Sequence, residues 1–232
     1  AHAAGAGRVY VELLDHSPTV MRVDPIRPEL MFRGDWAGTS ADAIARTTVV
    51  CGCGGGDAVR APLPRLLSLA RRLVLDADAL NALAADTALA TLLRARTARG
   101  HATVLTPHPL EAARLLACSS AEVQADRLRA VQALADGFAC VVVLKGSGSV
   151  IAAPQQVARI NSTGNASLAS AGTGDVLAGW LGGRWTQHAP GDEAATAFKV
   201  AQQAVAEHGA AAEPAPHGAL RAGDLIERLA AL

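Results

Sequence analysis

Aromatic residues are scarce in this chain of 232 residues, where Phe, Trp and Tyr together make up 3%. Proteins that bind single-stranded nucleic acid stack the bases on aromatic side chains, so we exclude that class. Charge of one sign is also not in excess, because 21 Lys and Arg residues balance 21 Asp and Glu residues. Any anion site must therefore be local, and we expect neither nucleic acid nor a membrane as a partner.

Long apolar runs are lacking as well, and none reaches the roughly 20 residues that cross a bilayer. Cysteine is limited to Cys51, Cys53, Cys118 and Cys140, and the one close pair does not have the spacing of a structural zinc site. We interpret these residues as free thiols of a cytoplasmic protein.

The apolar residues that are present form an alternating pattern. Short runs rich in Val and Ile, typical of strands, occur at 8–14, 47–51, 72–75, 103–105 and 139–144, with a hairpin at 149–153 and 157–160. Helical spacing occurs at 62–71, 87–99, 109–117, 121–135, 175–184, 192–207 and 223–231. This alternation predicts one α/β domain over residues 1–232, with helices on both faces of a mostly parallel sheet.

Polar or glycine-rich clusters follow four of the predicted strands. In such folds ligands bind beyond the carboxyl ends of the strands. The occurrence of polar clusters after four strands therefore indicates a ligand site more strongly than any one cluster does. The clusters are Gly52–Gly56, Asp76 with Asp78 and Asn81, Thr106–His108, and Lys145 with Gly146.

The strongest single pattern is Gly172-Thr173-Gly174-Asp175, directly before an apolar helical run. Glycines at a helix start allow backbone N–H groups to approach an anion, and the helix dipole favours negative charge there. The negative charge of Asp175 would repel a phosphate bound there unless the carboxylate binds a metal ion or accepts a proton. A simple helix cap is the alternative, and we favour catalysis.

A second anion site is predicted at Lys145, Gly146, Ser147, Gly148 and Ser149. A lysine just after a buried strand, with glycines and hydroxyls, suits nucleotide phosphates. The alternative is a hairpin turn with a solvated lysine. The order of residues is not that of a Walker A loop.

Each of the remaining clusters has a functional and a structural interpretation. The loop Gly52–Gly56 cradles a ligand's phosphate, lets a ring pack against bare backbone, or is a flexible turn. Asp76 and Asp78 hold a divalent cation through waters, orient a substrate hydroxyl, or cap a helix. His108 donates to a ligand or has a structural role.

Several of these segments, in their relative positions, resemble one known family. They are Thr106-Pro-His-Pro-Leu-Glu111, Val143-Leu-Lys-Gly146, Asp76-Ala-Asp-Ala-Leu-Asn81 and Asn161 followed by Gly172-Thr-Gly-Asp-Val-Leu-Ala-Gly179. From about Gly5 to the C-terminus the chain is similar to NAD(P)H-hydrate dehydratases of the ribokinase-like superfamily. The resemblance implies a three-layer α/β/α fold.

The resemblance also implies an activity in metabolite repair. Such a lyase dehydrates (6S)-NADHX or NADPHX to NADH or NADPH at the expense of ADP, or of ATP in eukaryotic relatives, and releases AMP and phosphate. It implies that Gly56 and His108 contact the hydrate and that Asp175 acts on its reacting end. The adenine nucleotide is then held by Lys145, Gly146, Ser147, Gly148, Ser149 and Gly174, and the phosphoryl oxygens by Gly172, Thr173 and Gly174.

Further implications concern partners. We expect Mg²⁺ on the nucleotide, with protein ligands that the sequence does not assign, a homotetramer, and an NAD(P)HX epimerase as functional partner or fused domain. The family's first strand and glycine-rich turn precede residue 1, so we expect the domain to lack its N-terminal strand.

The sequence departs from the family in the loop Gly52-Cys53-Gly54-Gly55-Gly56, where a Pro and a bulkier residue are usual, and at Leu110, where Gly is usual. Two rival functions remain at this stage. One is a small-molecule kinase of the same superfamily, acting on a vitamin precursor or a sugar. The other is a nucleotide-binding module without catalysis.

Overall fold

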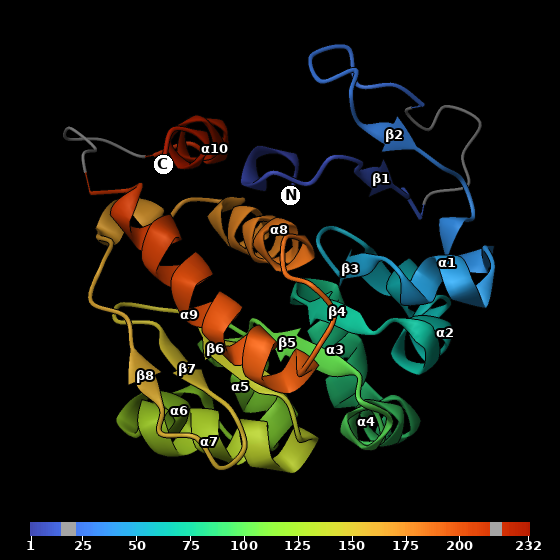
Figure 1. Ribbon diagram of the computed structural model, residues 1–232. Coiled ribbons are helices and arrows are strands. Elements are labelled where there is room, and N and C mark those ends of the chain that lie inside the picture. Colours follow the sequence, from blue (N-terminus) through green and yellow to red (C-terminus); the bar gives the residue numbers. More distant parts are fainter. Residues whose placement is uncertain (15–21, 214–219) are drawn as a thin grey trace.

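The computed structural model describes residues 1–14, 22–213 and 220–232. Its central sheet has six strands in sequence order, as Figure 1 shows. The strands are β3 (Thr48–Cys51), β4 (Arg72–Leu75), β5 (Ala102–Leu105), β6 (Val141–Leu144), β7 (Val150–Ala152) and β8 (Arg159–Ile160). Strands β3 to β6 are parallel, whereas β7 and β8 continue antiparallel. The predicted mostly parallel sheet and its terminal hairpin are confirmed.

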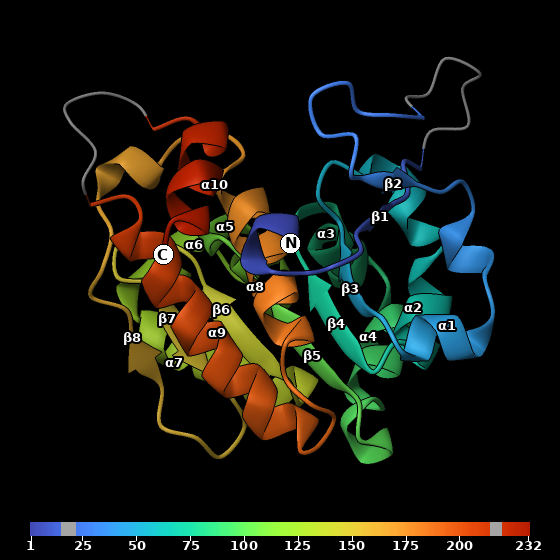
Figure 2. The same cartoon turned by 45° about the horizontal axis from the view of Figure 1, so that its top comes forward.

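Helices cover both faces of this sheet (Figures 1 and 2). One face carries α1 (Ala41–Ala45), α2 (Leu63–Leu69), α3 (Ala77–Ala85), α4 (Thr87–Arg94), α5 (Pro109–Leu116), α6 (Ser120–Ala125) and α7 (Arg127–Phe138). The other face carries α8 (Thr173–Thr186) and α9 (Glu193–Ala210), against which α10 (Ala222–Ala230) packs. The predicted three-layer α/β/α class is therefore confirmed. Among the described residues, no helix is both long enough and apolar enough to pass through a bilayer.

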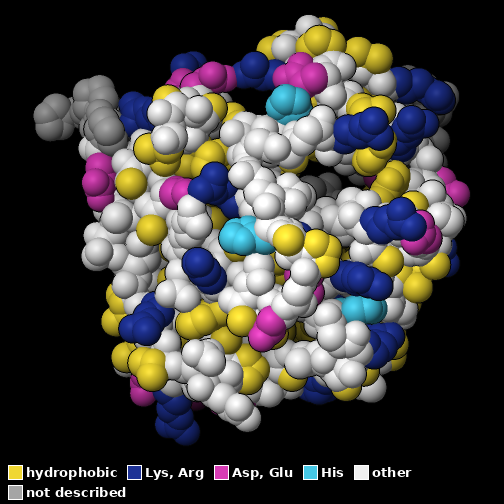
Figure 3. Space-filling view, in the orientation of Figure 1, with side chains coloured by type: hydrophobic (Ala, Val, Ile, Leu, Met, Phe, Trp, Pro, Cys, Tyr) yellow, Lys and Arg dark blue, Asp and Glu magenta, His cyan; other side chains and the backbone are white. Residues whose placement is uncertain are grey.

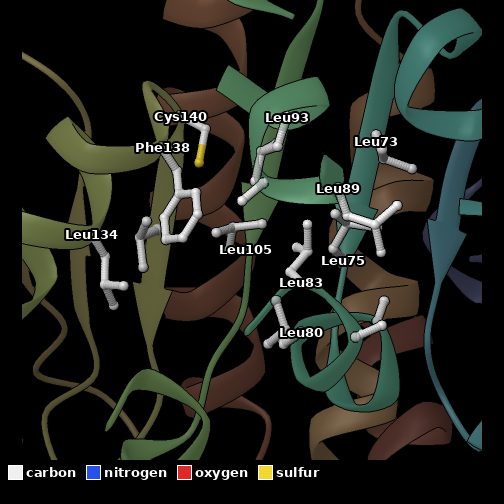
Figure 4. Close-up of a cluster of buried hydrophobic side chains, with 14 of the residues drawn as sticks. Leu73, Leu75, Leu80, Leu83, Leu89, Leu93, Leu105, Leu134, Phe138 and Cys140 are labelled. Carbon is white, nitrogen blue, oxygen red and sulfur yellow. The ribbon is translucent and has the colours of Figure 1, made fainter. Parts of the chain in front are cut away.

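Two hydrophobic clusters, one on each face, hold the layers together. Because successive side chains of a strand point to opposite faces, Leu73 and Leu75 of β4 join the cluster under α2 to α7, whereas Val74 joins the cluster under α8 and α9. All three are fully buried. Figure 4 shows Leu73 and Leu75 beside Leu80, Leu83 and Leu89 of the helical layer. The apolar run of β4 is thus explained by burial on both sides.

Several predicted boundaries were wrong. The strand expected at 8–14 is only β1 (Tyr10–Val11), which pairs with β2 (Met31–Phe32) in a separate two-stranded sheet. The helix expected at 121–135 is split, because Asp126 leaves the helical conformation (φ −145°, ψ 81°) and its side chain caps α7. Ser119 and Glu122 form a capping box at the start of α6. Helix α3 was not predicted.

Candidate active site

The carboxyl ends of β3 to β6 carry the candidate site. Hydrogen bonds continue beyond the strands and hold their following loops side by side. The N–H of Asp76 donates to Cys51 O (3.1 Å), that of Thr106 to Leu75 O (3.1 Å), and that of Lys145 to Pro107 O (2.8 Å). Four polar segments that are far apart in the sequence therefore meet at one edge, as the sequence predicted.

A buried ion pair lies at the centre of this edge. The ammonium of Lys145 donates to Oδ1 of Asp76 at 2.6 Å, and the Asp76 side chain is only 1% exposed. A buried carboxylate requires a partner of this kind. The hypothesis of a solvated Lys145 in a plain hairpin turn was wrong, because its side chain is 19% exposed and paired.

Asp175 lies in the first turn of α8 and is exposed. Ligand atoms of Asp175, Asp76 and Cys53 lie within 4.8 Å of one another. The predicted carboxylate of the helix start therefore stands beside the lysine–aspartate pair, where it can reach both a bound ligand and solvent.

The turn before Asp175 is held in place from inside the protein. Gly172 has a left-handed φ of 83°, a conformation that favours glycine. The hydroxyl of Thr173 lies 2.7 Å from Leu168 O and 2.8 Å from Ser170 O. Nε2 of the buried His208 donates to Thr173 O at 2.9 Å. Burial lowers the pKa of His208 below its ordinary value; the hydrogen bond to Thr173 O opposes this shift, and the charge of Lys145 adds to it. The ring is therefore neutral at pH 7.

Gly174 leaves the space between α8 and Lys145 open. A Cβ at this position would lie only 3.3 Å from the Lys145 ammonium. The first N–H groups of α8 and the lysine charge thus adjoin, and both favour an anion. This adjacency supports a phosphate position between residues 172–174 and the loop that begins at Lys145.

Cys53 lies in the site because its loop closely approaches the loop that follows β4. Gly52 has a φ of +119°, and a Cβ there would lie 1.9 Å from the carbonyl oxygen of Asp76. Only glycine permits this approach, which brings Cys53 beside Asp76 and Asp175. Although Cys53 is exposed, partial desolvation of its sulfur raises the pKa of the thiol above its ordinary value, and the carboxylates of Asp76 and Asp175 raise it further. The thiol is therefore protonated at neutral pH.

The other predicted hydrate contacts have structural partners here. His108 caps α5. Its ring Nδ1 accepts from the backbone N–H groups of Leu110 (3.1 Å) and Glu111 (3.4 Å), and the backbone N–H of His108 donates to the Glu111 carboxylate. Its side chain is still 46% exposed. The N–H of Gly56 donates to Oδ2 of Asp78 at 2.8 Å. Asp76 and Asp78 therefore have separate partners and do not share one site.

A cavity of about 1460 Å³ opens beside the site, between the N-terminal segment, β3 and α8. Cys53 and Gly56 line it, whereas Asp175 and Lys145 do not. Figure 3 shows an opening below the segment that carries β1 and β2, on a face where charges of both signs are mixed. The site thus has room for a large ligand on the Gly56 side.

Sequence reasoning missed three residues of this arrangement. Cys53 was interpreted as an ordinary thiol, and neither His208 nor Arg127 was considered. Arg127 donates to the backbone of residues 144–147. The position of Cys53 in a glycine loop at a strand end was the one available signal. His208 and Arg127 lie on helices far away in the sequence, with no local pattern to mark them.

Comparison with known proteins points to one family. The profile of the NAD(P)H-hydrate dehydratase family matches residues 1–230. The ADP-dependent (S)-NAD(P)H-hydrate dehydratase of Neisseria meningitidis is 42% identical over 179 residues, which cover 73% of this chain and 57% of that protein. The bifunctional NAD(P)H-hydrate repair enzyme of Escherichia coli is 37% identical over 90% of this chain and 38% of its own length.

Solved structures give the same result. The ADP/ATP-dependent NAD(P)H-hydrate dehydratase of Bacillus subtilis, co-crystallized with ATP/Mg²⁺ and soaked with CoA, superposes with a TM-score of 0.72 at 27% identity. The alignment covers 99% of this chain and 81% of that one. A ribokinase-like superfamily protein of Enterococcus faecalis, at 20% identity and a TM-score of 0.73 over 99% of this chain and 78% of that one, shares the fold.

The chain spans 57% and 38% of the lengths of the Neisseria and Escherichia relatives. The family match nevertheless extends over nearly all of its residues, and the polar groups at the strand ends are the ones that the family resemblance pointed to. The chain belongs to the NAD(P)H-hydrate dehydratase family of ribokinase-like fold.

Proposed function

We propose that this protein dehydrates (6S)-NADHX or NADPHX to NADH or NADPH at the expense of ADP, releasing AMP and phosphate. The observation that carries the proposal is the position of Asp175, whose carboxylate adjoins the Lys145–Asp76 pair at the start of α8. A carboxylate beside a phosphate position is suited to accept a proton from an attacking hydroxyl. The name of the Neisseria relative supports ADP as the phosphoryl donor.

The chemistry requires a better leaving group than hydroxide. Asp175 accepts the hydroxyl proton of the hydrate as its oxygen attacks the terminal phosphoryl group of ADP, and the bond to AMP breaks. The electrons of the ring nitrogen then expel phosphate, and loss of a proton from the neighbouring ring carbon restores the dihydropyridine. Hydrate and ADP thus give NAD(P)H, AMP, phosphate and one proton.

The residues around the transferred phosphoryl group stabilise its charge. The backbone N–H groups of Gly172, Thr173 and Gly174 are the proposed oxyanion site, although that of Thr173 also donates to Ser170 O over a long 3.4 Å. Lys145 supplies a positive point charge, and residues 146–149 hold the remaining phosphates together with Gly174. On the hydrate side, Gly56 and His108 are the proposed contacts; Gly56 lines the large cavity, and the half-exposed His108 ring is accessible to a ligand.

The donor set at the site is compatible with Mg²⁺. Carboxylate oxygens of Asp76 and Asp175 suit this cation, which protein sites hold by one or two carboxylates together with substrate phosphates. The thiol of Cys53 does not, because soft sulfur ligands select other metals. When bound, Mg²⁺ would be held mainly by the nucleotide phosphates and would neutralise part of their charge. Among the carboxylates of the site, Asp76 would be its protein neighbour, because Asp175 must stay free to accept the proton.

We further propose a cytoplasmic homotetramer that works with an NAD(P)HX epimerase, either separate or fused. The four free cysteines support a reducing compartment. The bifunctional name of the Escherichia relative supports a second repair activity nearby. Light scattering of the purified protein measures the oligomeric state, and a monomer would contradict the tetramer.

The direct test is incubation of the protein with NADHX and either ADP or ATP, following nicotinamide absorbance and the release of phosphate and AMP. We expect NADH to form with ADP. Asp175→Ala should lower kcat by about 10²–10⁴-fold, the usual range for a general base, while ADP still binds. A stable phosphorylated product without NADH would indicate a kinase, and ADP binding without any turnover would indicate a binding module.

A further inference from the structure

We propose that Arg127 is a positioning residue for the nucleotide loop, defined here as residues 145–149. Its guanidinium holds the carbonyl groups of the loop on one side, which turns loop N–H groups toward the phosphates of the adenine nucleotide. This inference rests on the proposed function of that loop. It concerns a residue at the start of α7 that is outside the phosphate loops.

Three carbonyl oxygens converge on this one side chain. Nη1 of Arg127 donates to Ser147 O at 2.6 Å, and Nη2 donates to Leu144 O at 3.1 Å and to Lys145 O at 3.3 Å. The planar guanidinium presents its donors in a fixed fork. It therefore fixes the relative orientation of the last peptide unit of β6 and of two peptide units in the loop.

The geometry of the peptide bond converts this into an orientation of the amides. The described peptide bonds are all trans, so the C=O and N–H of one unit point in opposite directions. When the carbonyls of Lys145 and Ser147 point at Arg127, the N–H groups of Gly146 and Gly148 point away from it. Neither N–H has an acceptor among the described residues. They are free donors in a loop that begins with a lysine.

Only a residue without a side chain fits at Gly146, because a Cβ there would lie 2.9 Å from Nη2 of Arg127. Its φ of +147° is also a conformation that L side chains rarely adopt. Because Gly146 has no side chain, the guanidinium can lie against it and the backbone can adopt the turn. The loop and the arginine form one unit.

The charge of Arg127 is not used in an ion pair within the part of the chain that is described. Its Nε is buried without a partner there, and burial lowers the pKa of the guanidinium. An arginine nevertheless stays protonated at neutral pH. A positive charge that only carbonyls compensate thus lies behind the loop, where it favours phosphate on the other side.

The test compares Arg127→Met and Arg127→Lys with the wild type for binding of ADP by calorimetry and for steady-state kinetics. Arg65→Met is the matched control, because Arg65 also clamps carbonyls, those of Ala37 (2.9 Å) and Thr39 (2.6 Å), but lies in α2. Both control and variant lose a carbonyl-bound guanidinium. They differ in whether the nucleotide loop depends on it.

We expect Arg127→Met to weaken ADP binding and raise its KM by about tenfold or more, with the KM for NADHX within about twofold. Arg127→Lys should recover part of the affinity, because it restores the charge but not the fork. Arg65→Met should bind ADP like the wild type even if it unfolds at a lower temperature.

Unchanged ADP affinity in Arg127→Met, or an equal loss in Arg65→Met, would overturn the role of Arg127. If Arg127→Met fails to fold, amide exchange at Gly146 and Gly148 in the ADP complex of Arg127→Lys decides. Protection weaker than in the wild-type complex supports the proposal, and equal protection contradicts it. A wild type that binds ADP but does not convert NADHX would refute the proposed function while leaving this comparison valid. A wild type that binds no ADP would refute both.

Discussion

Lys145 and Asp76 join the carboxyl ends of two strands that do not touch. The ammonium of Lys145, after β6, lies 2.6 Å from Oδ1 of Asp76, after β4, so their contact crosses the end of β5. Asp76 is 1% exposed. The pair therefore has two roles: it fixes the loops of the site, and it holds the lysine charge beside the start of α8.

Lys145→Met should lower the free energy of unfolding by about 3–5 kcal/mol, because it leaves the Asp76 carboxylate buried and unpaired. The double variant Asp76→Asn, Lys145→Met should recover most of this loss. ADP affinity should be weak in both, since each lacks the phosphate-binding charge. Urea unfolding and calorimetry measure the two effects. Additive stability losses would show that the residues are not energetically coupled.

Gly52→Ala should be far more disruptive than Gly54→Ala. Both glycines have positive φ, +119° and +64°, and left-handed strain alone costs about 1–2 kcal/mol for an alanine. At Gly52 the new Cβ would also lie 1.9 Å from the Asp76 carbonyl oxygen, whereas at Gly54 nothing lies within 4 Å. Thermal unfolding and NADHX turnover check this. Equal effects at the two positions would refute the close approach.

The parts of the fold that the sequence predicted are those with strong local signals. The apolar run of β4 was placed at its observed residues, because Leu73 and Leu75 are buried on one face and Val74 on the other. Helix α3 was missed because its first residues were interpreted as a polar ligand loop. Its apolar positions 79, 80, 82 and 83, all buried, carried the helical period.

The candidate site was predictable in part for a related reason. Asp175 and Lys145 belong to short, distinctive segments, and parallel strands bring their ends together. Which carboxylate pairs with Lys145 was not predictable, since Asp76 and Asp78 are two residues apart and only the backbone orientation decides between them. Contacts such as His208 with Thr173 join residues 35 apart in the sequence, beyond any local pattern.

His208 should make stability depend on pH. Burial lowers its pKa below the usual value, so the folded state keeps the ring neutral while the unfolded state takes up a proton near pH 6.5. Its contribution is therefore complete above about pH 6.5 and is lost as the pH falls toward the folded-state pKa, by up to about 1.4 kcal/mol per pH unit.

His208→Gln removes this titration and keeps an N–H donor for Thr173. Between pH 7 and pH 5 we expect the wild type to lose more unfolding free energy than the variant, measured in urea at each pH. His101, whose pKa burial and Arg96 also lower, is present in both proteins, so the comparison isolates His208. Parallel pH profiles would mean that His208 titrates alike in both states.

Cys53 should react slowly with iodoacetamide, because the thiolate is the nucleophile and burial with two nearby carboxylates raises the pKa of this thiol. At pH 7.5 we expect a rate about tenfold or more below that of free cysteine, increasing with pH. Once formed, the adduct lies beside Asp175 and should stop NADHX turnover, while Cys53→Ser resists inactivation. Peptide mass spectrometry identifies the modified residue. Fast labelling at neutral pH, or full activity after labelling, would place the sulfur away from the two carboxylates.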